Sequence, residues 1–338
     1  MIITLKSDIN NNELHNLKVY FESKNIKMKE IDSENDKQKM YLLVGPTYTL
    51  DEQSVLSLTG VLSCHRISKL YKLASRDYKE NDTIINVNGI KIGGKKIVFI
   101  AGPCSVENFE TVLNIGKVLK GVGVSILRGG AYKPRTSPYF FQGLKEEGLR
   151  ILSDVKEKLN MPVISEITDI CNIDEYDNVD IIQVGARNMK NYELLKALGR
   201  QNKPVMIKRS PDATIDELLL ASEYILKEGN PNVILCERGI RSFDKNTRGV
   251  LDLSSVPLLK KLTHLPVVVD PSHALGDYSL IEPMIYASIA SGCDGVMIEV
   301  HNDPSKALSD GKQSLKVDKV KDIIKKSAKI AKVIGRDI

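Results

Sequence analysis

Short apolar runs rich in Val and Ile recur along the chain from Lys95 onward, and each is followed by a stretch with helical spacing of apolar positions. Continuous apolar strands that alternate with helices are typical of a parallel sheet covered by helices. Eight such units favour a closed (β/α)8 barrel. The alternative is an open doubly wound sheet, but the turn after the first run, AGPCS, is not the glycine-rich phosphate turn of that fold. The predicted strands are Ile97–Ile100, Val124–Leu127, Pro162–Ser165, Ile181–Val184, Pro204–Ile207, Asn232–Leu235, Pro266–Val269 and Gly295–Ile298.

The pattern of residues 1–75 differs from that of the rest of the chain and predicts a small α+β domain of the ferredoxin-like type, with the order βαββαβ. Residues 76–94 are predicted to be a linker and a β-hairpin, because two alternating runs flank Asn88-Gly89. We expect this hairpin to cap one end of the barrel, which takes residues 95–338. The small domain's predicted strands are Ile2–Lys6, Ile26–Ile31, Met40–Val44 and Val61–Ile67, and its helices are Asn11–Lys24 and Leu50–Leu56.

Composition excludes several classes of protein. Apolar residues make up 42% of the chain and charged residues 27%, as in ordinary globular proteins, so extensive disorder is not expected. No apolar run is long enough to cross a membrane, and the N-terminus lacks the pattern of a secretory signal. The net charge of +5 is too small and too dispersed for a nucleic-acid surface. The five cysteines lack CxxC spacing, which indicates reduced thiols and a cytoplasmic location.

Basic side chains follow four of the eight predicted barrel strands. A single charge at a strand end is ordinarily solvated, but a barrel brings all its strand ends to one mouth. Six cations in one concave site repel one another unless anions occupy it, and Arg and Lys match phosphate and carboxylate groups. We therefore expect a ligand with phosphate and carboxylate groups, such as a sugar phosphate or phosphoenolpyruvate. The six residues are Arg128, Lys133, Arg135, Arg187, Lys208 and Arg238.

A second group of side chains suits a divalent transition metal. It contains a thiol, an imidazole and two carboxylates, which follow the first, seventh and eighth strands and so become neighbours in a closed barrel. The alternative is a buried structural cysteine beside an exposed loop histidine. His301 is a weaker candidate for this site, and the other four cysteines are interpreted as packing residues. The candidate metal ligands are Cys104, His273, Glu299 and Asp310.

Seven segments together resemble a known family: AGPCSVE, LRGGAYKPRTSPYFFQGL, DIIQVGARNM, KPVMIKR, VILCERGIR, LPVVVDPSH and GVMIEVHNDPSKALSDGKQSL. The sequence is similar to 3-deoxy-D-arabino-heptulosonate 7-phosphate (DAHP) synthase, in the shorter-barrel branch related to 3-deoxy-D-manno-octulosonate 8-phosphate synthase. The resemblance covers about Lys95 to Ile334. The N-terminal segment also resembles the ferredoxin-like, ACT-like regulatory domain that is fused to some members.

The resemblance implies a transferase that condenses phosphoenolpyruvate with erythrose 4-phosphate and releases phosphate, the first step of the shikimate pathway. It also implies one divalent ion (Mn, Fe, Co, Zn or Cu), held by the four candidate ligands and acting as a Lewis acid on the aldehyde. Cys104 and His273 are thereby counted among the catalytic residues. Lys133 is the candidate proton donor to the new alkoxide, with Glu166 or a water on the metal as the base.

The resemblance assigns the substrate contacts as well. Arg128 and Lys133 would hold the phosphoenolpyruvate carboxylate. Its phosphate would lie against Arg187 with the neighbouring Ala186, and against Lys208 and Arg238. The remaining assignments are Arg135 and Thr136 to the aldose phosphate and Asp270 to an aldose hydroxyl or the surroundings of the metal.

Three alternatives stay open from the sequence. An octulosonate synthase would use arabinose 5-phosphate, but it usually carries an Asn-Arg-Ser-Ser type of loop where this chain has KPRTSP. A class I aldolase would use Lys208 as a Schiff-base nucleophile, which leaves the metal-type group unexplained. The third is an amino-acid sensor without catalysis.

The resemblance further implies inhibition by Tyr, Phe or both at the N-terminal domain, and a homotetramer.

Overall fold

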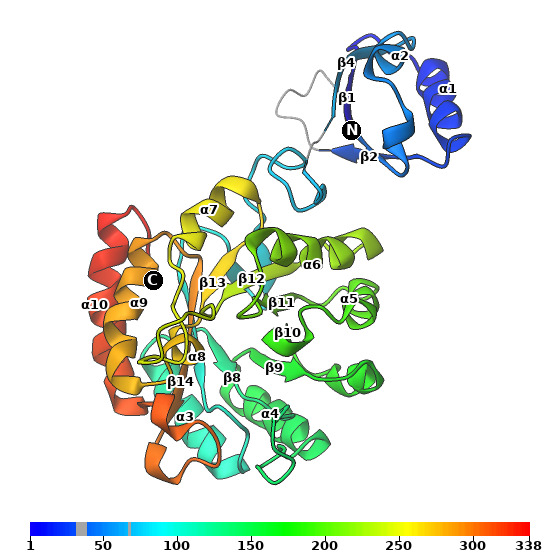
Figure 1. The fold of residues 1–338 in the computed structure, drawn as a ribbon. Coiled ribbons are helices and arrows are strands. Elements are labelled where there is room, and N and C mark those ends of the chain that lie inside the picture. Colours follow the sequence, from blue (N-terminus) through cyan, green and yellow to red (C-terminus); the bar gives the residue numbers. More distant parts are fainter. Residues whose placement is uncertain (32–38, 67–68) are drawn as a thin grey trace. The chain divides into compact units, whose positions relative to one another are not determined.

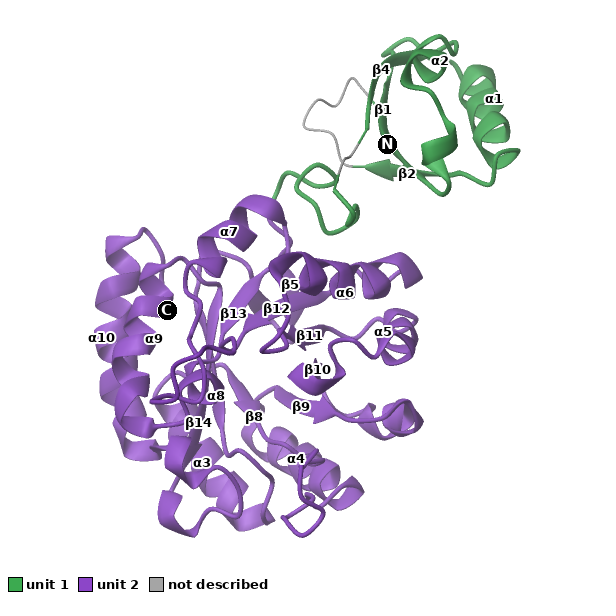
Figure 2. Ribbon diagram, viewed as in Figure 1, with its two compact units in different colours: residues 1–81 green, residues 82–338 purple. Residues whose placement is uncertain are grey.

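The computed structural model describes residues 1–31, 39–66 and 69–338, which fold as two units, Met1–Asn81 and Asp82–Ile338 (Figure 2). The first unit has the predicted order βαββαβ and an antiparallel sheet in the order β2-β3-β1-β4, as in ferredoxin-like folds. Residue 67, the predicted end of the fourth strand, lies outside the described residues. The elements are β1 (Ile2–Leu5), α1 (Asn11–Glu22), β2 (Lys27–Ile31), β3 (Met40–Val44), α2 (Glu52–Leu56) and β4 (Val61–His65).

Helix α1 shows how the sequence specifies this first unit. Asn10 caps the helix by accepting the backbone N–H of Glu13, whose side chain accepts the N–H of Asn10 in return. This reciprocal pair satisfies two backbone donors that a helix N-terminus otherwise leaves free. The helix then buries Leu17 and Phe21, and Phe21 packs in the same core as Ile3 of β1. The unit therefore has a hydrophobic core of its own.

Eight parallel strands form the second unit and close into a barrel through the pairing of β13 with β14 (Figure 1). The closed barrel is confirmed, and the open doubly wound sheet is excluded. A two-residue strand, β15 (Leu315–Lys316), pairs with the end of β14. The barrel strands are β7 (Val98–Gly102), β8 (Ile126–Arg128), β9 (Val163–Ile167), β10 (Ile181–Val184), β11 (Val205–Lys208), β12 (Val233–Glu237), β13 (Val267–Val269) and β14 (Gly295–His301).

Helices surround the strands on the outside of the barrel (Figure 1). The third strand–helix repeat of the barrel departs from the expected pattern. A 3-10 helix, η2 (Ile170–Tyr176), follows β9 where a longer helix was predicted. Cys171 lies on this short turn and is exposed, so its interpretation as a packing residue was wrong. The helices are α3 (Phe109–Gly121), α4 (Glu146–Leu159), α5 (Tyr192–Gly199), α6 (Ile215–Glu228), α7 (Ser255–Leu262), α8 (Pro271–Leu275), α9 (Ile281–Ala290) and α10 (Val320–Val333).

The predicted hairpin is present as β5 (Ile85–Val87) and β6 (Ile90–Ile92). Its apolar side chains join the core cluster that fills the barrel interior. Asn88 of the turn donates a 2.8 Å hydrogen bond to Asp180, immediately before β10 begins. The hairpin therefore caps the amino-terminal end of the barrel and leaves polar side chains to gather at the opposite end. Within the described part of the chain, every helix is too short or too polar to cross a lipid bilayer.

Candidate active site

Most barrel strands run beyond the apolar stretch that predicts them, and in five of them the added residues include a charged one. Arg128 ends β8, Lys208 ends β11 and Glu237 ends β12, whereas Glu166 and Glu299 lie inside β9 and β14. All of these side chains except the half-buried Glu166 are buried. Because the strands are parallel, these groups meet at the carboxyl end of the barrel, where enzymes of this fold carry their active sites.

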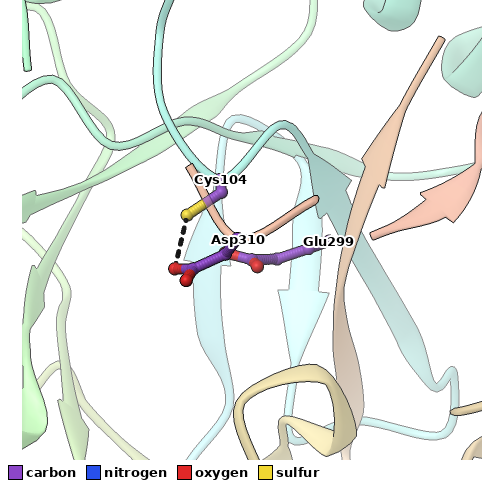
Figure 3. A group of neighbouring side chains, drawn as sticks. All are labelled: Cys104, Glu299 and Asp310. Carbon is purple, nitrogen blue, oxygen red and sulfur yellow. Dashed lines mark hydrogen bonds between the residues drawn. The ribbon is translucent and has the colours of Figure 1, made fainter. Parts of the chain in front are cut away.

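Three of the four candidate metal ligands form one group. The ligand atoms of Cys104, Glu299 and Asp310 all lie within 4.8 Å of one another (Figure 3). The Cys104 thiol donates a 3.1 Å hydrogen bond to Asp310 Oδ2. Cys104 follows β7 and Asp310 follows β14, so the closure of the barrel joins two segments that are 206 residues apart. A buried thiol beside two carboxylates is a donor set that fits a divalent transition metal.

The fourth candidate, His273 on α8, contacts the same group through Glu299. Its Nδ1 lies 2.8 Å from Asp270 Oδ2 and its Nε2 lies 3.3 Å from Glu299 Oε1. Burial opposes ionisation of Asp270, but His273 and Lys208 hold the pKa of that carboxyl well below its usual value. An ionised Asp270 can only accept, so Nδ1 carries a hydrogen.

Burial also lowers the pKa of His273, which favours the neutral ring at neutral pH. Neutral His273 therefore presents the lone pair of Nε2 to a carboxylate oxygen of Glu299, an unfavourable contact that a cation shared by the two groups would relieve.

Two cations lie against the candidate metal ligands. Arg128 Nη1 is 2.5 Å from Glu299 Oε1, and Lys133 Nζ is 3.1 Å from Cys104 Sγ. Burial and the charge of Glu299 raise the pKa of the Cys104 thiol to about 12. Burial alone would lower the pKa of Lys133, but Cys104 and Glu299 raise it, so Lys133 is protonated. Among the described residues, Arg128 Nε is one of two buried side-chain polar atoms without a hydrogen-bond partner.

Of the other basic residues, Lys208 forms an ion pair, whereas Arg187 and Arg238 line an open pocket. Lys208 Nζ forms a buried ion pair with Asp270, whereas a Schiff-base nucleophile needs a free amine. Arg238 donates to the backbone oxygen of His273 at 2.9 Å. Arg238 and the exposed Arg187 line one pocket of about 380 Å3, together with Ala186, Arg241 and Arg248.

The residues expected to hold the aldose phosphate lie on the loop between β8 and α4. Arg135 Nη1 is 3.9 Å from Asp310 Oδ1, and its Nε donates to the backbone oxygen of Phe141 at 3.3 Å. Thr136 is exposed. The structure therefore brings Arg135 to the edge of the metal-type group, whereas Thr136 lies on the outer part of the loop.

Glu166 is held by neighbours on β10 and on the turn that follows it. Its Oε2 accepts a 3.1 Å hydrogen bond from Gln183. Its Oε1 lies so close to Gly185 that a Cβ at that glycine would be 1.8 Å away. The carboxylate therefore depends on residue 185 having no side chain. His301 has a different role, because its Nδ1 lies 3.0 Å from the backbone N–H of Asp303 and its Nε2 3.4 Å from Glu107, outside the metal-type group.

Sequence reasoning did not single out three residues that the site uses. Gln183 and Gln313 are buried and donate to Glu166 and Glu299, and Arg248 donates to Gln313. Gln183 did carry a signal, since it is the one polar residue in the run IIQV. Gln313 and Arg248 are not marked by any such contrast with their neighbours.

The sequence profile of the DAHP synthetase I family matches residues 77–335. The chain belongs to this family. It is 44% identical over 338 residues to the phospho-2-dehydro-3-deoxyheptonate aldolase of Thermotoga maritima, covering 99% of both chains. It is 35% identical over 270 residues to a 2-dehydro-3-deoxyphosphooctonate aldolase of Geobacter sulfurreducens, covering 74% of this chain and 98% of the relative. The octulosonate-type relative is thus both less similar and shorter in its match.

Solved structures of family members agree with the fold. The crystal structure of the Thermotoga maritima DAHP synthase is 42% identical, with a TM-score of 0.79, and covers 99% of this chain and 98% of that one. A truncated form of that synthase is 43% identical, with a TM-score of 0.74, and covers 79% of this chain. The resemblance seen in the sequence motifs is therefore confirmed, both as a family and as a fold.

Proposed function

We propose that this chain condenses phosphoenolpyruvate with D-erythrose 4-phosphate and water to give DAHP and inorganic phosphate, and so begins the shikimate pathway. The observation that carries the proposal is the contact between two kinds of group at one barrel mouth. A thiol and carboxylates suited to a metal lie beside buried cations suited to an anionic substrate, as the pairs Lys133–Cys104 and Arg128–Glu299 illustrate. The similarity to DAHP synthases of known structure supports the same reaction.

The phosphoenolpyruvate carboxylate is assigned to Arg128 and Lys133. The unsatisfied Nε of Arg128 supports this, because a carboxylate oxygen would supply the missing acceptor. The phosphate is assigned to the arginine-lined pocket that holds Arg187 and Arg238, with Ala186 in its wall. Lys208, the remaining phosphate contact, would have to share its charge between substrate and Asp270.

The aldose is assigned to the opposite side of the metal-type group. Arg135 and Thr136 would take its phosphate, and Asp270 would orient a hydroxyl or the imidazole of His273. The proximity of Arg135 to Asp310 supports this placement, since the aldehyde must lie near the metal while its phosphate lies farther out along the loop. This assignment would bring the reacting carbons of the two substrates together beside the metal-type group.

One divalent ion is assigned to Cys104, His273, Glu299 and Asp310, and the mixed donor set fits Mn, Fe, Co, Zn or Cu. When bound, it would supply Lewis-acid polarisation of the aldehyde oxygen. The neutral His273 that faces Glu299 supports the assignment, because a cation relieves that contact.

The proton transfers are assigned to side chains of this chain. C3 of phosphoenolpyruvate forms a bond to the aldehyde carbon, and protonated Lys133 delivers a proton to the alkoxide that results. Positive charge then develops at C2, and water adds there while Glu166 accepts the water's proton. Loss of phosphate by C–O cleavage completes the reaction. The hydrogen bond from Gln183 supports the role of Glu166, because it fixes the carboxylate as an acceptor.

The deciding experiment measures phosphate release from phosphoenolpyruvate with erythrose 4-phosphate and, in parallel, with arabinose 5-phosphate. We expect turnover with the four-carbon sugar. Preferential turnover of arabinose 5-phosphate would identify an octulosonate synthase instead, and no release with either sugar would support the sensor hypothesis. A Lys133→Ala variant with undiminished turnover would remove the proton-donor assignment.

We propose further that the first unit is regulatory and binds Tyr, Phe or both in a homotetramer. The ferredoxin-like fold of residues 1–31 and 39–65 supports this, because such folds occur as the regulatory domain of some family members. Deletion of residues 1–75 should abolish inhibition by aromatic amino acids while phosphate release continues. Inhibition that survives the deletion contradicts the proposal.

We also propose a cytoplasmic location, which fits the five cysteines, all of which are free thiols.

A further inference from the structure

Gln313 lies at the centre of a hydrogen-bonded chain that begins outside the metal-type group and ends on one of its carboxylates. The residue closes a short 3-10 turn, η6 (Gly311–Gln313), directly after Asp310. It is 3% exposed. Its Nε2 donates a 2.6 Å hydrogen bond to Glu299 Oε2, and its Oε1 accepts a 2.9 Å hydrogen bond from Arg248 Nη1.

Arg248 fixes which end of the amide faces Glu299. A guanidinium group has donors only, so the oxygen of Gln313 must turn toward Arg248. The amide nitrogen then has to face Glu299, and an ionised carboxylate accepts its hydrogen. The orientation therefore follows from the chemistry of the two neighbours and does not depend on telling nitrogen from oxygen by position.

Glu299 is held from both sides as a result. Arg128 donates to Oε1, Gln313 donates to Oε2, and the backbone N–H of the same glutamate donates to Ser272. Two donors on different oxygens fix the plane of a carboxylate, whereas one donor leaves it free to rotate. The plane matters because it decides whether an oxygen of Glu299 points toward the same position as the ligand atoms of Cys104 and Asp310.

We propose that Gln313 is a positioning residue that orients Glu299 for the divalent cation, with Arg248 acting through Gln313. The inference rests on the proposed metal site and assigns to two further residues a function in building it. Hydrogen bonds to a metal-binding carboxylate tune metal affinity, and their removal costs about 10- to 100-fold in that affinity. Gln313 touches no substrate in this assignment, whereas Arg248 also lines the pocket assigned to the phosphate, so the test measures metal binding in the absence of substrate.

The test uses the full chain, freed of metal and titrated with Co2+, whose absorption reports both occupancy and a thiolate ligand. Gln313→Met keeps most of the side-chain volume and removes both hydrogen bonds. We expect its Co2+ dissociation constant, measured by competition with a chelator, to rise about 10- to 100-fold. The melting temperature of the metal-free protein is measured alongside, so that loss of affinity is separated from loss of fold. If that variant does not fold, Gln313→Asn, whose amide is too short to reach both partners, should show the same change.

A matched control is available on the other side of the barrel. Gln183 is also 3% exposed and also donates to a glutamate, but that glutamate, Glu166, is not in the metal-type group. Gln183→Met should therefore leave the Co2+ dissociation constant within about twofold of the parent value while losing a comparable buried hydrogen bond. An equal loss of Co2+ affinity in both variants would mean that any damage to the barrel mouth weakens the metal, and would overturn the proposal.

Arg248→Met separates positioning from simple electrostatics. Removal of a nearby positive charge should by itself strengthen the binding of a cation, whereas loss of the amide orientation should weaken it. We expect weaker Co2+ binding than in the parent, and no further loss when Arg248→Met is added to Gln313→Met. Unchanged or stronger binding overturns the function assigned to Arg248, and an unaltered affinity in Gln313→Met overturns the whole inference. A parent protein that binds no Co2+ overturns the proposed metal site itself, and the inference with it.

Discussion

Substitution of Arg209 by Met should destabilise the barrel far more than the loss of an exposed ion pair with the same N···O distance would. Arg209 follows β11 and lies 2.9 Å from both Glu237 and Asp252, and its side chain is 6% exposed while that of Glu237 is fully buried. Breaking a buried pair from one side typically costs about 3–5 kcal/mol, because it leaves an uncompensated charge. Gly239 still donates to Glu237 at 2.6 Å, so we expect the lower end of that range, about 3 kcal/mol.

The matched control is Arg200→Met. Arg200 lies at the same distance, 2.9 Å, from Glu228, but its side chain is 66% exposed. An exposed pair contributes about 0–1 kcal/mol because water screens both charges. Urea denaturation followed by circular dichroism gives both free energies of unfolding. Equal losses in the two variants, or a loss below about 1 kcal/mol for Arg209→Met, would refute the reasoning from burial.

The pH dependence of the Arg209 variant gives a second check. Burial already raises the pKa of Glu237 in the folded parent. Loss of Arg209 raises it further, so the folded state binds a proton more tightly than the unfolded state does. Stability from such a group is present at low pH and is lost as pH rises through the folded pKa. The deficit of Arg209→Met should therefore be smaller at pH 5 than at pH 8, and Glu237→Gln added to it should restore part of the stability. A deficit that grows toward pH 5 would contradict this.

Three further predictions concern the hairpin, the base and the metal. Ile92→Ala should lower the free energy of unfolding by about 2–5 kcal/mol in urea denaturation, because Ile92 is fully buried in the barrel core; a loss below about 1 kcal/mol contradicts this. Gly185→Ala should reduce kcat for phosphate release by about 100-fold, because the new methyl group displaces Glu166; unchanged kcat removes Glu166 as the base. Treatment with EDTA should abolish turnover and Mn2+ should restore it, whereas activity that resists chelation argues against the metal.

The fold could be predicted because its signals are local and repeated. Eight apolar runs and one Asn-Gly turn define the barrel and its cap without any knowledge of distant contacts. The ends of several strands were predicted too early, as at Arg128, Lys208 and Glu299, because a charged residue was interpreted as the first residue outside the sheet. Arg128 and Glu299 remain in their strands because each neutralises the other, and such a pair is created only by the closure of the barrel.

The site could be predicted in part because the order of the strands shows which strand ends become neighbours in a closed barrel. Cys104 and Asp310 meet, as the order of the strands implies, but the partner of each charge depends on register and rotamer. Lys208 is bonded to Asp270, a pairing that its position after an apolar run does not reveal. Gln313 was not predicted, because the sequence does not distinguish a buried glutamine in a loop from an exposed one.

Among the described residues, the hairpin β5–β6 closes the end of the barrel where the strands begin. Its isoleucines plug the end where the strands begin, and the interior behind them is packed with aliphatic side chains. Whatever reaches the cations at the other end has to leave by the route it came. Under the proposed function, both organic substrates, both products and any exchanging ion would pass through the carboxyl end of the barrel, and a group that covered this end would block entry and release together.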